Sequence, residues 1–248
     1  MSVGGVRQEG VLARMSGHAA RQEGGLARTH EGEPGLPRGR SGLPLDAVRG
    51  AQRGRLLRAV IAAVGQAGYR DLTVSDIVRG ARVSRAAFYA HFSDKEDCFL
   101  AATRQGGLLM ANRVMAAARQ QPADASAEAT LRASIAAFLE FLVEEPTFAR
   151  VFYIDMPMAG PKAVRQIEAA LHAFAGLNRT WHERARGDHP AWPAVPYHAY
   201  YALAGATTEL VRAEVRRGRT DAVTGLEDTL VALHLAVLAG QPWALPPA

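Results

Sequence analysis

Cysteine is almost absent from this 248-residue sequence, in which Cys98 is the only one. An intramolecular disulfide is therefore excluded, and a reducing cytoplasm is the expected compartment. A lone cysteine at helical spacing is expected to be a small buried apolar residue rather than a redox sensor. The sequence also has no apolar run of transmembrane length, and its N-terminus lacks the apolar core of a signal peptide. These absences predict a cytoplasmic protein without a membrane partner.

Motifs of enzymes are also missing. The sequence has no phosphate-binding glycine loop, no zinc-type Cys/His spacing and no nucleophile in a recognisable motif. His182, Glu183 and His189 could be read as a metal cluster, but Gly187 and Pro190 make a loop the better interpretation. We therefore expect no enzymatic activity, no metal and no cofactor.

Lysine is scarce, with two residues against 27 arginines, and the net charge of +5 is unevenly placed. Residues 1–58 hold ten arginines and five acidic residues, whereas residues 105–248 hold thirteen basic and fourteen acidic residues. A basic N-terminal region beside a near-neutral body indicates a polyanionic partner at that end.

Large apolar residues are rare in residues 1–46, so we expect a disordered basic arm there. The arm contains an imperfect duplication, Arg7–Arg14 against Arg21–Arg28, and two copies do not make a repeat fold. Two alternatives stay open: the arm is functional, or translation begins at Met15, which lies in frame.

Three short helices are predicted in residues 47–97. In the first, Leu57, Val60, Ile61 and Val64 repeat at helical spacing, and Gly68 stands where a C-terminal cap belongs. In the second, Thr73 is the expected N-cap, with Asp76 three residues later in a pattern typical of a capping box. In the third, Arg85 to Phe92, Ser84 is the expected N-cap.

The third helix presents two different faces. Phe88 and Phe92, four residues apart, are expected to anchor it from behind, so the remaining side chains must face outward. A short helix, a tight turn and an exposed second helix place that second helix in the DNA major groove. We predict that the capped helix ends and the outward side chains contact DNA: Thr73, Ser84, Arg85, Ala86, Tyr89, His91 and Lys95.

The stretch from Leu72 to Leu100 strongly resembles the DNA-binding domain of the TetR family of bacterial regulators. The segments that carry this resemblance are Thr73–Ile77, Ala81–Arg85, Phe88–Phe92 and Ser93–Glu96. The resemblance implies a homodimer, usually a repressor, that a small molecule releases from its operator. The family commonly has glycine where this chain has Arg82, and a positive φ there would cost arginine on the order of 1 kcal/mol more than glycine.

The remaining residues, 98–248, read as further helices divided by proline and glycine breakers. The sequence thus predicts an all-α fold: a disordered arm (1–46), a three-helix helix-turn-helix DNA-binding domain (47–97) and a C-terminal helical bundle for ligand binding and dimerisation (98–248). Helices are expected from about Tyr197 to Arg217 and around Leu226 to Val237.

These last two helices are the expected homodimer interface. They carry an apolar stripe made of Tyr200, Leu203, Thr207, Leu210 and Val211, with the leucines of the final helix beside it. The alternative is that the stripes pack only within one subunit. A dimer is expected because two recognition helices related by a two-fold axis can enter successive major grooves of a palindromic operator, about 34 Å apart.

Aromatic residues and methionines of the bundle suit an apolar pocket for a lipophilic or aromatic effector. The residues proposed to bind it are Phe138, Phe152, Met156, His172, Trp181 and Tyr200. Each of them could instead be plain core. We expect the effector to shift the fourth helix and move the two recognition helices out of register with the operator, which makes the chain a ligand-responsive repressor. The alternative is a ligand-binding helical adaptor without DNA binding.

Overall fold

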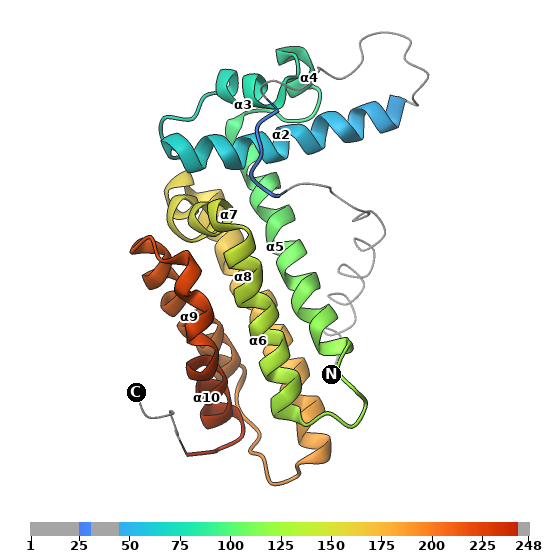
Figure 1. Ribbon diagram of the computed structural model, residues 1–248, viewed down its shortest axis with the longest axis vertical. Helices are drawn as coiled ribbons and strands as arrows, with labels where there is room; N and C mark the ends of the chain where they lie inside the picture. The colour runs from blue at the N-terminus through green and yellow to red at the C-terminus, as the bar shows by residue number, and fades with distance from the viewer. Residues whose placement is uncertain (1–24, 31–44, 243–248) are drawn as a thin grey trace.

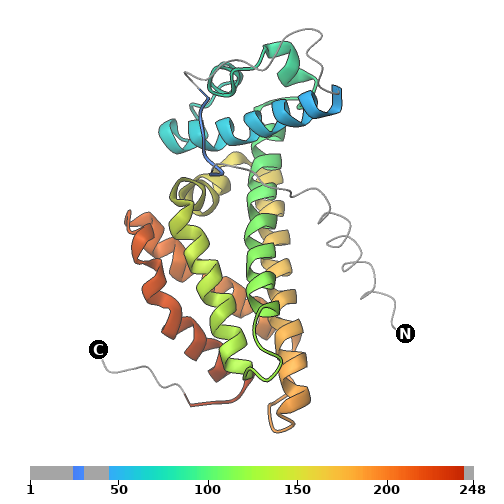
Figure 2. The same ribbon diagram turned by 45° about the vertical axis from the view of Figure 1, so that its right-hand side comes forward.

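The computed structural model describes residues 25–30 and 45–242, and within these ranges all regular structure is helical. A small N-terminal unit lies at one end of the molecule, with α2 lying across the top of a bundle of long helices (Figures 1 and 2). None of the helices in the described part of the chain is long and apolar enough to cross a lipid bilayer. The predicted all-α fold is confirmed.

The N-terminal unit consists of α2 (Leu45–Ala67), α3 (Val74–Ala81) and α4 (Arg85–Tyr89). The predicted apolar stripe of α2 is buried along its whole length. Gly68 ends the helix with φ 81°, and its N–H donates to the carbonyl of Val64 at 2.7 Å. Helix α2 begins at Leu45, before the predicted boundary at residue 47, and α4 ends at Tyr89 rather than at Phe92.

The turn between α3 and α4 contains Arg82 in the left-handed conformation, with φ 51° and ψ 45°. The positive φ that the comparison with glycine anticipated is therefore present, and the chain adopts it with arginine. The Arg82 N–H donates to the carbonyl of Arg79 at 3.1 Å and so closes the end of α3.

Helix α5 (Lys95–Arg119) belongs to both parts of the molecule. Its first turns, with Cys98 and Phe99 buried, complete the core of the N-terminal unit, and the rest of the helix runs down the bundle (Figure 2). The predicted division between residues 97 and 98 therefore falls inside one continuous helix.

The bundle continues through a further series of helical segments. They are α6 (Ala127–Glu144), α7 (Pro146–Arg150), a π-helical turn η2 (Val151–Asp155), η3 (Met156–Ala159), α8 (Pro161–Asp188), α9 (Tyr197–Arg216), η4 (Thr220–Leu226) and α10 (Glu227–Leu238). The positions agree with the breakers in the sequence, since Pro146 and Pro161 each stand first in a helix, where proline is tolerated.

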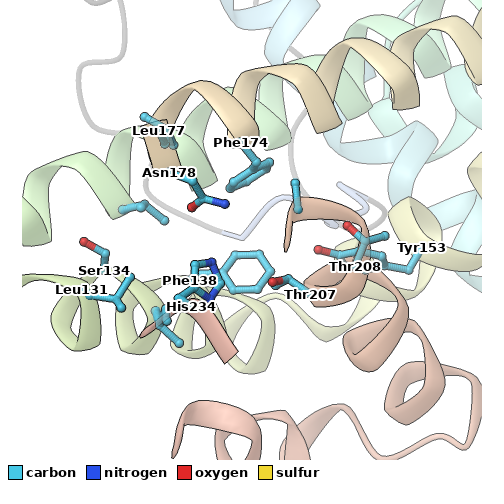
Figure 3. A pocket seen from close by; sticks show the side chains of 13 residues that line it. Leu131, Ser134, Phe138, Tyr153, Phe174, Leu177, Asn178, Thr207, Thr208 and His234 are labelled. Carbon is cyan, nitrogen blue, oxygen red and sulfur yellow. The ribbon is translucent and has the colours of Figure 1, made fainter. Parts of the chain in front are cut away.

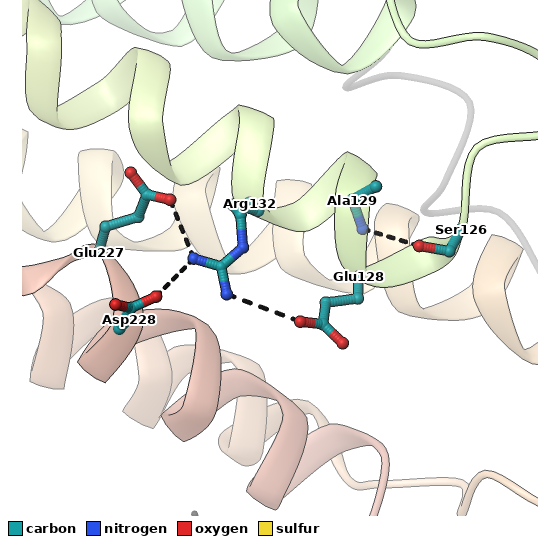
Figure 4. A network of polar contacts seen from close by, with 6 residues as sticks. All are labelled: Ser126, Glu128, Ala129, Arg132, Glu227 and Asp228. Carbon is teal, nitrogen blue, oxygen red and sulfur yellow. Dashed lines mark hydrogen bonds and ion pairs between the residues drawn. The ribbon is translucent and has the colours of Figure 1, made fainter. Parts of the chain in front are cut away.

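An ionic contact fixes α10 against α6 (Figure 4). The Arg132 guanidinium of α6 lies 3.0 Å from a Glu227 carboxylate oxygen and 2.6 Å from one of Asp228. Both acidic residues lie in the first turn of α10, where the helix dipole stabilises negative charge. The contact thus joins the first turn of α10 to α6 at the surface.

The apolar stripe of α9 points into its own subunit. Tyr200, Leu203 and Val211 are buried in the single chain. The residues proposed for the dimer interface are thus largely used within the monomer, so any dimer contact of α9 must use its other face.

The N-terminal arm departs from the expected disorder over residues 25–30. This segment packs against the molecule, with His30 only 3% exposed. Its His30 N–H donates to the carbonyl of Gly80 in α3 at 2.7 Å. Few apolar residues surround Leu26 in the sequence, so no pattern there predicted that the segment would pack against the molecule.

Candidate DNA-binding surface and ligand cavity

Helix α4 presents a polar face to solvent because its apolar side is fixed from behind. Phe88 is completely buried and packs on Phe92 with ring centroids 5.8 Å apart. On the opposite side Arg85 and Ala86 are exposed, and Tyr89 is 51% exposed. The geometry leaves a cation, a small residue and a hydrogen-bonding aromatic residue accessible on one short helix at the end of the molecule.

The two predicted N-caps serve their own helices. The Thr73 hydroxyl oxygen accepts the Asp76 N–H at 3.2 Å, and the Asp76 carboxylate accepts the Thr73 N–H at 3.0 Å, which completes the capping box. The Thr73 hydroxyl also hydrogen-bonds this carboxylate and holds the pKa of Asp76 below its ordinary value. Ser84 accepts the Ala87 N–H at 3.1 Å. The start of α3 thus already carries a carboxylate where a phosphate had been expected.

Lys95 is engaged inside the subunit. Its ammonium donates to the carbonyl oxygens of Leu72 at 2.7 Å, Arg70 at 3.3 Å and Tyr69 at 3.4 Å, and lies 5.1 Å from the centre of the Tyr69 ring. An ammonium has three N–H donors, and these contacts use all of them. Lys95 therefore positions the connection between α2 and α3, and this structure does not offer it as a free cation.

His91 lies half-buried beside the basic face of α2. Burial lowers the pKa of His91, and the nearby Arg53 and Arg49 lower it further. The Arg53 guanidinium also lies 5.4 Å from the centre of the Phe92 ring. The ring of His91 is consequently neutral at pH 7 and can act by hydrogen bonding rather than by charge.

Arg49 and Arg53 are exposed residues that the sequence interpretation did not include. They stand four residues apart on α2 and therefore share one face of it. Their four-residue spacing was a possible signal, but the sequence analysis considered only the apolar stripe of this helix, from Leu57 onward. Together with Arg85 they add positive charge around α4.

A cavity of about 80 Å³ lies inside the bundle (Figure 3), several times the space of about 10–15 Å³ that one water needs. Helices α5, α6, α8, α9 and α10 and the turn η2 all contribute to its wall. Its lining is mainly apolar and consists of Val114, Leu131, Ser134, Ile135, Phe138, Tyr153, Phe174, Leu177, Asn178, Ala204, Thr207, Thr208 and His234.

Of the six residues proposed to bind an effector, Phe138 lines this cavity. The structure places the other five elsewhere. Phe152 and Met156 pack in the core near α7, and the indole N–H of Trp181 donates to the Ala127 carbonyl at 3.0 Å. His172 and Tyr200 bond to other side chains: His172 Nδ1 to the Tyr197 hydroxyl and the Tyr200 hydroxyl to His182 Nδ1, each at 2.8 Å.

The polar groups in the cavity wall come from α6, η2, α8, α9 and α10, and the sequence interpretation did not name them as ligand contacts. The Thr207 hydroxyl is buried without a hydrogen-bond partner among the described residues. His234 Nδ1 lies 2.7 Å from the Leu230 carbonyl, and burial lowers the pKa of this histidine, which keeps it neutral. No Asp, Glu, Lys or Arg is among the described residues that line the cavity. The site can accordingly hold an apolar group and a neutral polar atom.

The turn η2 connects the cavity to the N-terminal unit. Tyr153 lines the cavity, and two residues later the buried Asp155 accepts a hydrogen bond from the backbone N–H of Tyr69, just after α2. Burial raises the pKa of Asp155 above its ordinary value. On the preceding turn Arg150 donates to the Gly65 carbonyl at 3.1 Å. A displacement of η2 would therefore move the end of α2 through these two contacts.

Within residues 25–30 and 45–242, no group of three or more His, Cys, Asp or Glu side chains is arranged to hold a metal ion. Cys98 is buried, and burial raises the pKa of its thiol. A thiol in that state is a poor nucleophile, since the thiolate is the reactive form.

Residues 56–102, from α2 into α5, match the family described as bacterial regulatory proteins, tetR family. A solved fatty acid degradation regulator, FadR from Bacillus halodurans, shares the fold at 16% identity with a TM-score of 0.65, over 75% of this chain and 98% of that one. FadR from Bacillus subtilis, solved in complex with stearoyl-CoA, is 16% identical with a TM-score of 0.64 over 74% and 98%. A TetR-like transcriptional regulator from Rhodococcus sp. RHA1 is 23% identical with a TM-score of 0.57 over 80% and 100%.

The family match covers the helix-turn-helix, and the shared fold extends over the helical body. The chain thus carries, in residues 56–102, a helix-turn-helix that matches the tetR family of bacterial regulatory proteins, on a fold that it shares with solved regulators.

Proposed function

We propose that the protein is a cytoplasmic, homodimeric repressor that a lipophilic effector releases from a palindromic operator. The observation that carries this proposal is the pairing of an exposed polar face on α4 with a separate apolar cavity, joined by η2. Ligand and DNA then bind to different states of one molecule, and linkage requires each to weaken the binding of the other.

In this proposal α4 enters the major groove. Arg85 and Tyr89 read base edges or phosphates, Ala86 permits close approach, and Arg49 and Arg53 of α2 contact the backbone. Thr73 and Ser84 act through the helix ends that they cap, His91 as a neutral hydrogen-bonding group, and Lys95 by holding the α2–α3 connection.

The homodimer is proposed to form through the outward faces of α9 and α10. The outward side of α9 includes Gly205, around which an added Cβ would meet no other atom within 4 Å. On α10, Val237 is 38% exposed although it is a large apolar residue. Two-fold pairing of these faces would cover them and hold two α4 helices in a fixed relation.

Gly205→Leu tests this interface. The leucine fits the isolated subunit, so the variant should fold but should dimerise more weakly, as measured by sedimentation velocity across a concentration series. Gly187→Leu at the end of α8, where the space is also open, is the matched control. An unchanged dimer in Gly205→Leu would place the interface elsewhere.

The proposed effector is a molecule with an uncharged apolar portion, such as a long acyl chain. The lining supports this, because it is mainly apolar and carries no charged side chain among the described residues. The similar FadR from Bacillus subtilis was solved with stearoyl-CoA. Because 80 Å³ is smaller than the usual 300–1,000 Å³ of a ligand site, entry requires the helices to move apart.

That movement supplies the proposed signal. An effector that displaces Tyr153 shifts η2, and the contacts of Asp155 with Tyr69 and of Arg150 with Gly65 pass the shift to the end of α2. A π-helical turn can change its hydrogen-bond pattern locally, which suits such a switch. The recognition helices then leave the spacing that the operator requires.

DNA binding is tested with sequences that the wild-type protein selects from a random pool. Arg85→Ala and Tyr89→Ala should each weaken binding of the selected DNA by about 10–100-fold, the cost of one good base contact. Arg165→Ala, an exposed arginine on α8, should bind as the wild type does. Failure to select any sequence would favour the adaptor alternative over the repressor.

The cavity is tested by filling it. Ala204→Leu occupies part of the space in the wall, whereas Ala173→Leu adds the same atoms to the exposed side of α8. With stearoyl-CoA and stearic acid as probes, the wild type and Ala173→Leu should release DNA, and Ala204→Leu should remain bound. Equal release from all three proteins would show that the cavity is not the effector site.

A further inference from the structure

Residues 25–30 cross the joint between the helix-turn-helix and the helical body (Figure 1). Three backbone N–H groups at alternating positions anchor this segment: Leu26 to a Glu145 carboxylate oxygen at 2.8 Å, Arg28 to the Arg58 carbonyl at 3.3 Å and His30 to the Gly80 carbonyl at 2.7 Å. Alternation with a period of two is the pattern of an extended chain. The three acceptors lie on different elements, so the segment connects parts of the molecule that are far apart in sequence.

The end of the segment at His30 is tied to the helix-turn-helix. Gly80 is the last residue but one of α3, and the final carbonyls of a helix have no partner within it. The His30 N–H supplies a partner to one of them, and Thr29 packs beside Gly80, with its methyl carbon 3.7 Å from the position of an added Cβ. The segment therefore caps the helix that directly precedes the turn and α4.

The end of the segment at Gly25 is tied to the helical body. Glu145 lies at the junction of α6 and α7, and its side chain makes no capping bond to α7. Its carboxylate instead receives the Leu26 N–H, and Leu26 and Ala27 pack against the main hydrophobic core. A carboxylate that accepts a backbone N–H makes a stronger bond than a neutral acceptor does.

We infer that residues 25–30, here called the brace, restrict the angle between the helix-turn-helix and the helical body and thereby favour the arrangement that binds DNA. The two ends of the brace are fixed to the two parts whose relative movement would carry an effector signal. Release of the brace lets the helix-turn-helix move more freely relative to the helical body. A more mobile recognition helix loses more conformational entropy when it binds DNA, so its affinity for DNA is lower. This role goes beyond the proposed function and does not depend on which effector or operator is used.

The duplicated sequence of the arm sharpens the inference. Arg7–Arg14 and Arg21–Arg28 differ only at one position, which is Val11 in the first copy and Gly25 in the second. A Cβ at residue 25 would lie 3.1 and 3.2 Å from the two Glu145 carboxylate oxygens, tighter than nine in ten real Cβ contacts, so the carboxylate that holds the Leu26 N–H would have to shift. The two branches of valine would add to this crowding. In the observed register, therefore, the second copy fits with the Glu145 carboxylate in place, whereas the first copy would displace this carboxylate from its bond to the backbone.

Gly25→Val turns the second copy into the sequence of the first and is the principal test, with Val11→Gly as its matched control. Trypsin cleavage after Arg28, followed by mass spectrometry, reports docking, since a docked backbone resists a protease. Loss of one anchoring hydrogen bond should speed this cleavage about fivefold in Gly25→Val and leave it unchanged in Val11→Gly. Equal cleavage in the wild type and Gly25→Val would overturn the docking.

Glu145→Ala is a second variant that should release residues 25–30 from the helical body. It removes the acceptor of the Leu26 N–H, and Glu140→Ala on the same helix removes only a surface contact with Arg113 at 3.6 Å. Glu145→Ala should match Gly25→Val in cleavage after Arg28, and Glu140→Ala should match the wild type. A slower or unchanged cleavage in Glu145→Ala would contradict the anchor.

The angle itself is measured with spin labels at Ser75→Cys in α3 and Glu168→Cys in α8, both exposed. Cys98 is buried and its thiol pKa is raised, so it does not take up label. The distance distribution should broaden in Gly25→Val and stay narrow in Val11→Gly. An equally narrow distribution in both would show that the brace does not restrict the joint.

Affinity for the selected DNA completes the test. Gly25→Val should bind about fivefold more weakly than Val11→Gly, in proportion to the one anchor lost. Unchanged affinity together with faster cleavage would reduce the brace to a structural element without regulatory effect. If no DNA is selected, the proposed function fails, while cleavage and label distances still decide whether the brace exists.

Discussion

The helix-turn-helix and the helical body build their sites in opposite ways. The face of α4 is exposed and is created by short capped helices whose anchoring residues lie within the same stretch of chain, such as Phe88 and Phe92. The cavity lies between helices and needs five helices and a turn that lie up to 120 residues apart, from Val114 to His234. A surface site can therefore be specified by local pattern, whereas an internal site depends on how distant helices pack.

The largest effect should follow from removing the support of α4. Phe88→Ala deletes a completely buried ring and should cost about 3–5 kcal/mol of unfolding free energy, with loss of DNA binding. Chemical denaturation of Phe88→Ala and Phe88→Leu measures this, and the leucine variant should lose less. A stable Phe88→Ala that still binds DNA would break the contrast, because α4 would then not depend on its local anchor.

A close contact in the body should give the next largest effect. An added Cβ at Gly106 of α5 would clash with the ring of Phe148, so Gly106→Ala should destabilise by about 1–3 kcal/mol. Gly176→Ala on α8, where the space is open, should instead stabilise by about 0.5–1 kcal/mol, since alanine favours a helix. Thermal unfolding of both variants checks the sign. A neutral Gly106→Ala would mean that α5 and α7 pack loosely.

In the cavity, one substitution should raise the stability of the protein and weaken its binding of an effector. Thr207→Val replaces a buried hydroxyl that has no partner among the described residues and should raise the unfolding free energy by about 1 kcal/mol. The same change should weaken an effector whose polar atom reaches Thr207, as measured by titration with stearic acid. Ser134→Ala is the comparison, because its hydroxyl donates to the Thr130 carbonyl. A destabilised Thr207→Val would indicate an unseen partner for this hydroxyl.

A smaller gain is expected in the turn of the helix-turn-helix. Arg82→Gly relieves the left-handed conformation at φ 51° and should stabilise by about 0.5–1 kcal/mol. The measurement is the unfolding free energy, with Arg79→Gly in α3 as a control that should lose stability. If Arg82→Gly instead lowers DNA affinity, the arginine is retained for a phosphate contact.

The smallest expected effect is the loss of unfolding free energy at low pH. The pKa of Asp76 is lowered mainly by the Thr73 hydroxyl, so its contribution to stability is present above the ordinary pKa of about 3.9 and is lost as pH falls through the lower folded value. The Asp76 side chain is 33% exposed, so solvent screens its contacts and we expect on the order of 0.5 kcal/mol. Urea unfolding of the wild type between pH 5 and pH 2.5 should show this decline, and the stability of Asp76→Asn should fall less over the same range, since Glu144, whose pKa the Arg113 hydrogen bond also lowers, still titrates there.

Sequence patterns predicted the elements well but not what their faces touch. The caps at Thr73 and Ser84, the stop at Gly68 and the buried side of α2 depend on neighbours within a turn or two and were all predicted correctly. The stripe on α9 was also real, but periodicity does not tell whether a stripe faces its own subunit or a partner.

Long-range contacts explain the remaining differences. Lys95 looked like a free cation at a helix start, yet its partners are carbonyls 23 to 26 residues away. Asn178, Thr208 and His234 meet at the cavity from three helices, and no local pattern marks such a meeting. The docking of residues 25–30 depends on Glu145, 119 residues away from Leu26.

Helix α5 spans the distance between the two sites as a single rod. Lys95 and Val114 are separated by nineteen residues, which at 1.5 Å per residue is roughly 28 Å. A tilt of about 5° at the cavity end would carry the other end sideways by roughly 2.5 Å, close to half the spacing of a helical turn. If an effector tilts α5 in this way, a small displacement beside Val114 becomes a larger displacement of the helix-turn-helix relative to the DNA.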